Sequence, residues 1–367
     1  MIFWLCLFIG ILVLQYVILL FLITVNWKHH SKQLHQYPRV SVLIAARNEE
    51  KTLPLLLESL DQLKYPEDRL EILLADDQSE DYTAGLIQAW ASQRSNRKLV
   101  SIQSGQIECY QKNGKANALA ILAQQAGGDY FFFTDADCEV PQSWIEEGVS
   151  SFAGNTGLLI GITQVKSGNF FEKMQELDWW YTLGLVKTVT DLGLPATGLG
   201  NNMVISREAY KKSGGFEGLP YSLTEDLEIS KAVARAGFGI RHQVSSSFLV
   251  KTKAEKDWKS LLGQRKRWMA GVMTLSLSWR MLLGIQFLFF PVVLVILVYS
   301  LKLGVVLWGM KICVQSFFLR IFAKKAAQKI GFLPLVCFDI YQIQSLSLTI
   351  LYYFWPRQTQ WKARNYP

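Results

Sequence analysis

The chain has 367 residues, which is enough for one large domain or two small ones and for a sizeable core. Half of the residues are apolar and the mean hydropathy is +0.16, which argues against an ordinary soluble protein and indicates membrane segments. The formal charge is +8, and the five cysteines and four histidines show no paired or metal-ligand spacing, which argues against a disulfide framework and a zinc site.

The first predicted element is a membrane helix, because residues 2–25 contain no charged side chain. Such a helix is long enough to cross a hydrocarbon core of about 30 Å. A cleaved signal peptide is the alternative, but no basic segment precedes the apolar run and no small-residue cleavage site follows it. Lys28, Lys32 and Arg39 follow directly, which favours a cytoplasmic domain after the helix and an outside N-terminus. We therefore predict a transmembrane helix over residues 1–27 of a plasma-membrane protein.

The middle of the chain, residues 38–268, has the composition of a globular domain in which predicted strands and helices alternate. The predicted strands cover residues 39–45, 70–75, 98–102 and 130–134, and the predicted helices residues 53–63, 82–91 and 116–126. This alternation indicates an α/β fold with a mostly parallel sheet that is covered on both faces.

Polar side chains follow three of these strands and are expected to meet at one edge of the sheet, where ligands of such sheets bind. Arg47 and Glu49 follow the first strand, Asp77 the second, and Asp135 and Asp137 the fourth. Two aspartates at this spacing suit Mg²⁺ or Mn²⁺ that takes one or two carboxylates and completes its shell with phosphate oxygens. A polar turn after a strand is the alternative interpretation.

Two further charged residues lie at predicted helix starts. Lys115 could reach a phosphate at the same edge, although a lysine that begins a helix is often only solvated. Asp226 lies in the first turn of a helix predicted from Thr224 to Gly237, where the helix dipole keeps a carboxylate ionised. A general base requires an ionised carboxylate, so catalysis and simple helix capping are both compatible with this position.

Two aromatic-rich helices complete the domain. The helix predicted from Phe170 to about Thr190 is more typical of core, and it could also line an acceptor entrance beside the bilayer through Trp179 and Trp180. In the helix predicted over residues 257–276, the side chains of Gln264, Arg267 and Trp268 share one face. Arg265 and Lys266 are expected to face lipid headgroups or water. A basic helix lying on anionic lipid is the alternative, and nucleic acid is disfavoured because the chain has no other basic aromatic array.

The C-terminal membrane region covers residues 281–355, with two or three spans, and a tail follows over residues 356–367. Residues 281–301 contain no charge and predict the second span, whereas residues 303–319 are marginal because of Lys311. Residues 331–355 carry Asp339, Gln342 and Gln344, so this segment either spans or re-enters. In a four-span arrangement Lys311 and Asp339 each lie about 12 Å from the cytoplasmic ends of adjacent helices, which predicts an ion pair. The basic residues of the tail then lie on the outer side of the membrane, against the tendency of basic residues to lie on the cytoplasmic side. This tendency therefore does not settle the side of the C-terminus.

Seven segments of the chain together resemble the membrane-bound inverting glycosyltransferases of family 2, which have a GT-A fold and include ceramide glucosyltransferases and cellulose and hyaluronan synthases. They follow in the family's order from about residue 38 to residue 268: AARNEE, LLADDQSED, NGKANALA, FTDADC, GLGNNM, TEDLEIS and QRKRW. The resemblance implies a nucleotide-binding group of Arg47, Glu49, Asp77, Lys115 and Asp135, a divalent metal on Asp137, the base Asp226, and contacts to donor diphosphate and acceptor from Gln264, Arg267 and Trp268. Asn202 departs from the commoner small residue and implies an altered acceptor choice.

We therefore predict a transferase that moves a sugar from a nucleotide-diphosphate donor to a hydroxyl group of a membrane lipid. The resemblance implies a UDP-sugar. Few spans favour this function, because an enzyme that secretes a polymer needs a lined channel. A small polysaccharide synthase with a glycan acceptor is the first alternative, and a catalytically silent scaffold is the second. The oligomeric state stays open.

Overall fold

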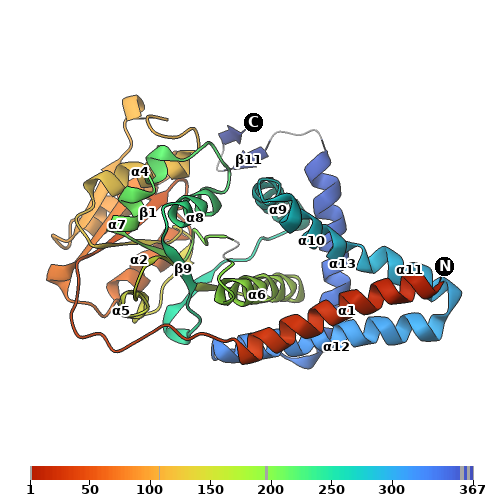
Figure 1. Cartoon of the computed structure of the whole chain (residues 1–367). Coiled ribbons are helices and arrows are strands. Elements are labelled where there is room, and N and C mark those ends of the chain that lie inside the picture. Colours follow the sequence, from red (N-terminus) through yellow and green to blue (C-terminus); the bar gives the residue numbers. More distant parts are fainter. Residues whose placement is uncertain (1, 107, 195–196, 356–358, 362–363, 367) are drawn as a thin grey trace.

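The computed structural model of the chain describes residues 2–106, 108–194, 197–355, 359–361 and 364–366. An α/β domain lies at one end and an elongated group of apolar helices at the other (Figure 1). Half of the predicted tail, residues 356–367, lies outside the described residues, including Arg357 and Lys362.

The α/β domain is built on a seven-stranded sheet of order β3-β2-β1-β4-β8-β6-β9. Strands β3, β2, β1 and β4 are parallel to one another, β8 is antiparallel to β4 and β6, and β9 is parallel to β6. The prediction of a mostly parallel sheet is therefore confirmed. The strands are β1 (Val40–Ala46), β2 (Leu70–Asp76), β3 (Arg97–Ser101), β4 (Tyr130–Phe133), β6 (Thr156–Ile160), β8 (Met203–Ser206) and β9 (Gly239–His242).

Helices cover both faces of this sheet, and each face has its own core. Successive side chains of a strand point to opposite faces, so Val42 and Ile44 pack with α2, α3 and α5 whereas Leu43 packs with α4, α7 and α8. These helices are α2 (Leu53–Asp61), α3 (Thr83–Ala91), α4 (Gly114–Gln125), α5 (Trp144–Ser150), α7 (Arg207–Lys212) and α8 (Glu225–Arg235). The boundaries of the first three agree with the sequence prediction to within a few residues.

A smaller sheet lies beside the first one and was not predicted. Its strands are β5 (Cys138–Glu139), β10 (Leu249–Thr252) and β7 (Ile162–Val165), in the order β5-β10-β7. Strand β10 is antiparallel to β5 and parallel to β7. This pairing brings residue 253 next to the segment that follows β4.

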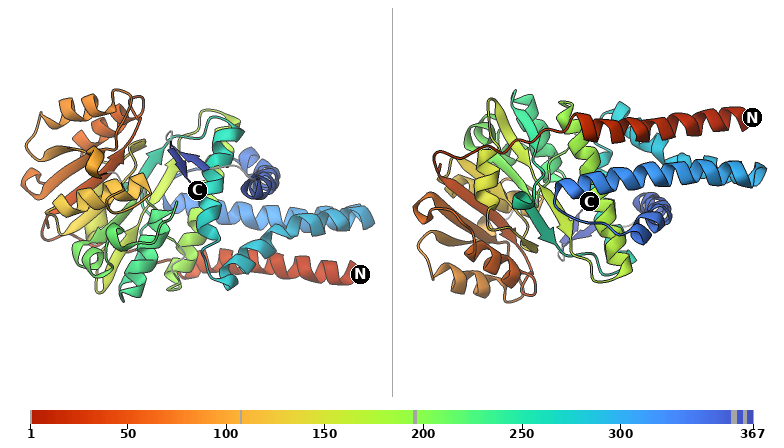
Figure 2. Two further views of the ribbon diagram at one scale, coloured as in Figure 1. Left: turned by 90° about the horizontal axis from the view of Figure 1, so that it is seen from above. Right: turned by 90° about the horizontal axis from the view of Figure 1, so that it is seen from below.

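The membrane-side helices differ in direction. They are α1 (Ile2–Val25), α10 (Leu277–Phe287), α11 (Phe289–Tyr299), α12 (Leu301–Lys325) and α13 (Phe332–Phe354). By length and composition, four segments are able to cross a membrane, namely residues 3–25, 277–299, 301–325 and 332–354. Helices α1, α11 and α12 run side by side, whereas α13 runs across their direction in Figure 1 and is seen nearly end-on beside them in Figure 2. The marginal segment, residues 303–319, is thus part of one long helix.

A buried polar cluster joins α13 to α12 and confirms the predicted pairing of Lys311 with Asp339. The Lys311 ammonium contacts the Asp339 carboxylate and lies 3.2 Å from the Gln315 Oε1 and 3.4 Å from the Gln342 Oε1. The Trp308 Nε1 donates to the other carboxylate oxygen at 2.5 Å. Both charges are therefore paired and hydrogen-bonded, which is the condition for burying them among apolar helices.

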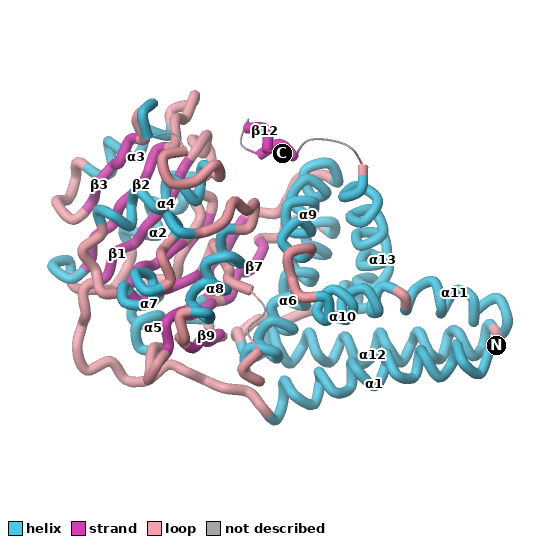
Figure 3. Tube along the Cα trace, turned by 45° about the horizontal axis from the view of Figure 1, so that its top comes forward, coloured by secondary structure: helices cyan, strands magenta, loops and turns pink. Residues whose placement is uncertain are grey.

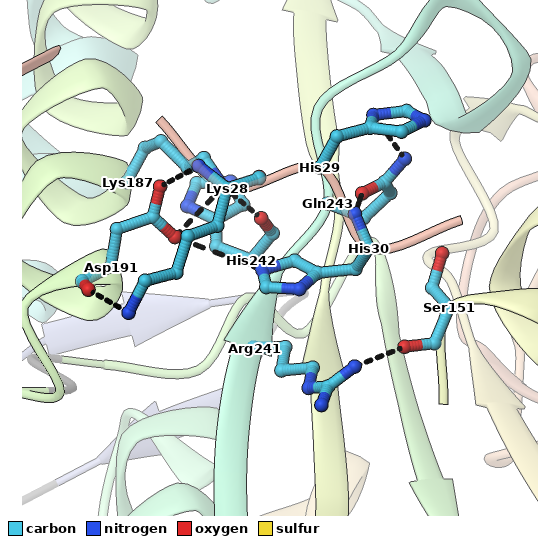
Figure 4. Close-up of polar contacts among 9 residues, drawn as sticks. All are labelled: Lys28, His29, His30, Ser151, Lys187, Asp191, Arg241, His242 and Gln243. Atoms are coloured by element: carbon cyan, nitrogen blue, oxygen red, sulfur yellow. Dashed lines mark hydrogen bonds and ion pairs between the residues drawn. The ribbon is translucent and has the colours of Figure 1, made fainter. Parts of the chain in front are cut away.

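A second buried cluster holds the segment after α1 against α6 (Phe170–Asp191) (Figure 4). The Lys187 Nζ donates to the backbone carbonyls of Lys28 at 2.6 Å and His242 at 2.7 Å, and lies 2.9 Å from Asp191. Asp191 also accepts the Lys28 amide at 2.9 Å. Burial lowers the pKa of His242 to about 3, so its ring is neutral beside this lysine. The cluster fixes α1 relative to the domain.

Candidate active site

A cavity of about 910 Å³ lies where the carboxyl ends of β1, β2 and β4 face α6, α8 and α9 (Trp258–Val272). Figures 1 and 3 show α6, α9 and α10 at the junction between the sheet domain and the membrane-side helices. All of the predicted site residues line this one cavity: Arg47, Glu49, Asp77, Lys115, Asp135, Asp137, Asp226, Gln264, Arg267 and Trp268. Residues as far apart in the chain as positions 47 and 268 are thus brought together.

The first corner of the cavity is formed by the turns after β1 and β2. The Arg47 Nη1 donates to the backbone carbonyls of Asp77 at 2.6 Å and Gln78 at 2.9 Å. Asn48 and Gln78 have φ angles of 53° and 57°, so both turns use the left-handed region that non-glycine residues rarely adopt. The guanidinium group of Arg47 therefore joins the two turns and holds their polar groups at the cavity wall.

Lys115 forms the second corner, where it lies between two carboxylates. Its Nζ is 2.6 Å from Asp135 and 2.8 Å from Glu225, and its side chain is only 15% exposed. Burial by itself would lower the pKa of Lys115, but the two carboxylates outweigh burial and raise the pKa above its usual value. The alternative of a merely solvated lysine is therefore wrong. Sequence reasoning missed Glu225, although its position next to Asp226 was a signal.

Asp137 forms the third corner and contacts a lysine that sequence reasoning also missed. The Lys253 Nζ lies 3.1 Å from Asp137 and 3.7 Å from Glu49. Burial would lower the pKa of Lys253, but these carboxylates raise it, so the ammonium stays charged. No sequence spacing links Lys253 to Asp137, because the two meet only through the pairing of β10 with β5.

The donor set of this corner fits a divalent metal with few protein ligands. The Asp137 side chain is 21% exposed and lines the cavity. Among the described residues, no group of three or more carboxylates, histidines or cysteines is placed to hold a metal. One or two carboxylates with phosphate oxygens from a ligand are a typical set for Mg²⁺. Asp137 and Asp135 are therefore the candidate protein ligands.

Asp226 lies at the start of α8, partly buried in the cavity wall. Its Oδ2 accepts the Gly200 amide at 2.9 Å, and its Oδ1 accepts the Leu227 amide at 2.8 Å. Burial and the neighbouring Glu225 raise the pKa of Asp226 to about 6, despite the opposing Lys115 and the two amides. The expectation from the sequence included the helix dipole but left out burial, which raises this pKa. The carboxylate is ionised at neutral pH and still basic enough to accept a proton.

The GLGNN segment approaches Asp226 closely, which explains its glycines. A Cβ added at Gly198 would lie 2.3 Å from the Asp226 carbonyl oxygen. The position of Asn202 gives no support to the prediction that it alters acceptor choice. Asn202 is fully buried, donates to the carbonyls of Ile162 and Phe248 at 2.8 Å, and does not line the cavity. Its amide joins the two sheets instead.

Helix α9 closes the cavity on the membrane side. The Gln264 Nε2 donates to Glu255 at 3.0 Å, and the rings of Trp268 and Trp179 meet edge to face at 5.2 Å. Arg265 does not face headgroups or water as expected, because it pairs with Asp178 of α6 and lies over the Trp268 ring. Lys266 donates to the Trp355 carbonyl at 3.1 Å and lines the cavity. Both side chains therefore have interaction partners within the protein.

Trp179 and Trp180 of α6, which the sequence analysis considered together, have different surroundings. Trp180 is fully buried in the core below the cavity, where its ring contacts Phe322. Trp179 lines the cavity beside Trp268. The core interpretation is therefore confirmed for Trp180, whereas an acceptor entrance at Trp179 stays a prediction.

Comparison with known proteins identifies the family. Residues 41–214 match Glycosyl transferase family 2, and residues 130–354 match Glycosyl transferase family group 2. The chain belongs to glycosyltransferase family 2. Its catalytic domain has the GT-A fold of glycosyltransferases.

Two relatives of this chain are named for different products, a glycolipid and a polysaccharide. A beta-monoglucosyldiacylglycerol synthase from Synechocystis sp. is 28% identical over 249 residues, which are 64% of this chain and 48% of that protein. A poly-beta-1,6-N-acetyl-D-glucosamine synthase from Staphylococcus epidermidis is 25% identical over 241 residues, 64% of this chain and 55% of that protein. The chain spans about half the length of the curated relatives it matches.

A solved structure supports the fold over nearly the whole chain. The mannosyltransferase PcManGT from Pyrobaculum calidifontis, in complex with GDP-Man and Mn²⁺, superimposes with a TM-score of 0.60 and 16% sequence identity. The match covers 94% of this chain and 95% of that chain. At this identity the likeness establishes a common fold, membrane-side helices included.

Proposed function

We propose that this glycosyltransferase transfers a sugar, with inversion, from a nucleoside-diphosphate sugar to a hydroxyl group of a membrane lipid. The observation that carries the proposal is the composition of the cavity that the predicted site residues line. A charged end holds Lys115, Asp137 and Asp226, and an apolar end is lined by α6 and by the membrane-side helices α1 and α10. The charged end suits a polar donor, and the apolar end suits the hydrocarbon part of an amphiphilic acceptor.

The proposed roles follow from charge and position. Arg47, Glu49 and Asp77 surround the nucleotide base, and Asp135 holds the ribose or sugar. Lys115 and Arg267 stabilise the negative charge that grows on the departing diphosphate. Asp137, together with Asp135, would hold Mg²⁺ or Mn²⁺, which supplies further charge stabilisation on the phosphate oxygens when bound. UDP is our proposed carrier, by resemblance to the family.

Asp226 is the proposed general base. It takes the proton of the acceptor hydroxyl while the acceptor oxygen forms a bond to the anomeric carbon. The bond from that carbon to the diphosphate oxygen breaks on the opposite face, and the electron pair leaves with the nucleoside diphosphate. One displacement of this kind inverts the anomeric configuration. Gln264 and Trp268 position the sugar and the acceptor, the ring of Trp268 offering an apolar face.

The side-by-side packing of α1, α11 and α12 supports the proposed topology. We propose that α1, α10 with α11, and α12 cross the bilayer, and that α13 lies across them near its cytoplasmic side (Figures 1 and 2). Three crossings place the N-terminus outside and the tail on the side of the catalytic domain. Arg320, Lys324 and Lys325 then share the cytoplasmic side with the basic tail, so the positive-inside tendency is no longer split.

A panel experiment tests the proposed function. The purified full chain in detergent is incubated with nucleotide sugars and a total lipid extract, and new species are identified by mass spectrometry. We expect one glycolipid that carries one or a few sugars. A long polymer instead would establish the second candidate, a polysaccharide synthase, which the poly-beta-1,6-N-acetyl-D-glucosamine synthase relative favours.

The pH dependence of transfer is expected to report the raised pKa of Asp226. The base works only when ionised, so kcat/KM should fall about tenfold per pH unit below a pH of about 6. Glu225→Gln removes a negative neighbour that raises this pKa, so the acid limb should move to lower pH. Profiles of kcat/KM for both proteins check this. An acid limb that does not move in the variant would contradict the proposed electrostatic coupling.

Removal of the proposed metal ligand should affect donor binding. We expect Asp137→Ala to weaken the Mn²⁺-dependent binding of the sugar nucleotide by at least about 10- to 100-fold, because even outer-shell partners of metals have effects of this size. Titration calorimetry with Mn²⁺ and with a chelator measures it. Asp68→Ala is the matched control, since Asp68 is exposed and does not line the cavity. Equal affinity of Asp137→Ala and wild type under both conditions would remove the metal assignment.

A further inference from the structure

The apolar end of the cavity contains two glutamines that no role proposed so far uses. Gln15 lies in α1 and Gln286 in α10, and both line the cavity with Leu19, Trp279, Leu282 and Leu283. Within the described part of the chain, neither side-chain amide has a hydrogen-bond partner. A polar group in a membrane helix without a partner is costly, and such residues commonly mark substrate pathways.

Each amide lies at a similar distance along its own helix from a helix end that faces the catalytic domain. Gln15 precedes the end of α1 at Val25 by a distance of about 15 Å along the helix, and Gln286 follows the start of α10 at Leu277 by about 13 Å. Both of these helix ends lie on the side of the catalytic domain (Figure 1). The cavity thus carries polar groups below its charged end, among otherwise apolar side chains.

The cavity also has an apolar rim that faces outward. Leu282 and Leu283 line it and are nevertheless 40% and 39% exposed, and the adjacent Met281 and Ile285 of α10 are exposed as well. In a bilayer these side chains contact lipid, so an acyl chain can pass between the cavity and the membrane without crossing water.

Amide groups recognise carbonyl oxygens, because the side-chain NH₂ of glutamine has two donors. We propose that Gln15 and Gln286 bind the acyl carbonyl groups of the acceptor lipid while its hydroxyl group lies at Asp226. The acceptor is then an acylated lipid with a free hydroxyl group, and a polyprenol without carbonyl groups does not fit. This inference rests on the proposed lipid transfer and specifies its substrate class.

The occupant is a lipid rather than a glycan because most side chains at this end are apolar. A growing glycan needs hydrogen-bond partners along its whole length, whereas Leu19, Trp279, Leu282 and Leu283 offer none to a sugar apart from one indole N–H. Two amides match two acyl carbonyl groups instead.

The test compares two acceptors that differ only in these carbonyl groups. The full chain is reconstituted in phosphatidylcholine vesicles with dioleoylglycerol or with the dioleyl ether analogue, together with the sugar nucleotide that is turned over in the panel. We expect wild type to prefer the ester by about 10-fold in kcat/KM, since each lost neutral hydrogen bond costs a few-fold. Gln15→Leu and Gln286→Leu should each reduce the preference to about threefold, and the double variant should abolish it.

Gln344→Leu provides the matched control, because Gln344 is an exposed glutamine of α13 that does not line the cavity. This variant should keep the full preference. Equal use of the ester and ether by wild type, or loss of the preference in the control, would overturn the assignment of the two amides while leaving lipid transfer in place. Polymer formation without transfer to either lipid would overturn the proposed function itself, and this inference with it.

Discussion

Asp226→Asn should reduce sugar transfer by about 10²- to 10⁴-fold while leaving donor binding nearly unchanged. The substitution keeps the shape of the side chain and an oxygen that can accept the Gly200 amide. It removes the group that accepts the acceptor proton, so only the chemical step loses its base. Single-turnover transfer and calorimetric donor binding measure the two effects separately.

Glu228→Gln is the appropriate control for this experiment. Glu228 belongs to the same helix, pairs with Lys231 at 2.7 Å and does not line the cavity. A general effect of acidic residues on α8 would lower transfer in both variants. Transfer by Asp226→Asn within tenfold of wild type would remove Asp226 from the role of base.

The buried pair of Lys311 and Asp339 should produce the largest effect on folding. Lys311→Met leaves the Asp339 carboxylate buried without its cation, which is expected to destabilise the protein by about 3–5 kcal/mol. The double variant Lys311→Met/Asp339→Leu removes both charges and should recover most of this loss. Thermal unfolding in detergent and the yield of monodisperse protein measure the stability.

Two further variants test whether the loss of stability comes from the Lys311–Asp339 ion pair. Lys302→Met changes an exposed lysine of the same helix and should have little effect. Exchange of the two charges, as Lys311→Asp/Asp339→Lys, should recover more stability than either single reversal. If neither double variant recovers stability, the two residues act separately and the pair does not hold α13 on α12.

The strands near the N-terminal half of the domain could be predicted because their periodicity is local. Strand-like runs such as residues 39–45 and 70–75 alternate with segments whose apolar residues recur at helical spacing. A parallel sheet follows from this alternation of strands and helices. The order of the remaining strands could not be predicted, because β8, β6 and β9 are short and pair across long intervals. The direction of α13 was equally hidden, since its hydropathy is compatible with a span and its packing against α6, α9 and α12 is set only by the tertiary structure.

The residues of the candidate site show the same contrast between local sequence pattern and tertiary contacts. Motif spacing pointed to Asp135, Asp137, Asp226 and the Gln264 to Trp268 face, and the structure brings these together in one cavity. Arg265 was misjudged because charge alone suggests exposure, whereas Asp178 lies in another helix and is adjacent only after packing. The structural role of Asn202 was hidden for the same reason, since its partners Ile162 and Phe248 come from distant segments.

By itself, the sequence determined the family, the alternating domain, the apolar helices and the residue types that the chemistry requires, because these depend on local pattern and on motifs in order. Tertiary structure alone decided that Lys253 contacts Asp137 and that Lys115 pairs with Glu225. It also decided that Gln15 and Gln286 line the same cavity as Asp226. Contacts of this kind join residues far apart in the chain. They are set by how strands pair and helices pack, and no spacing within the sequence records them.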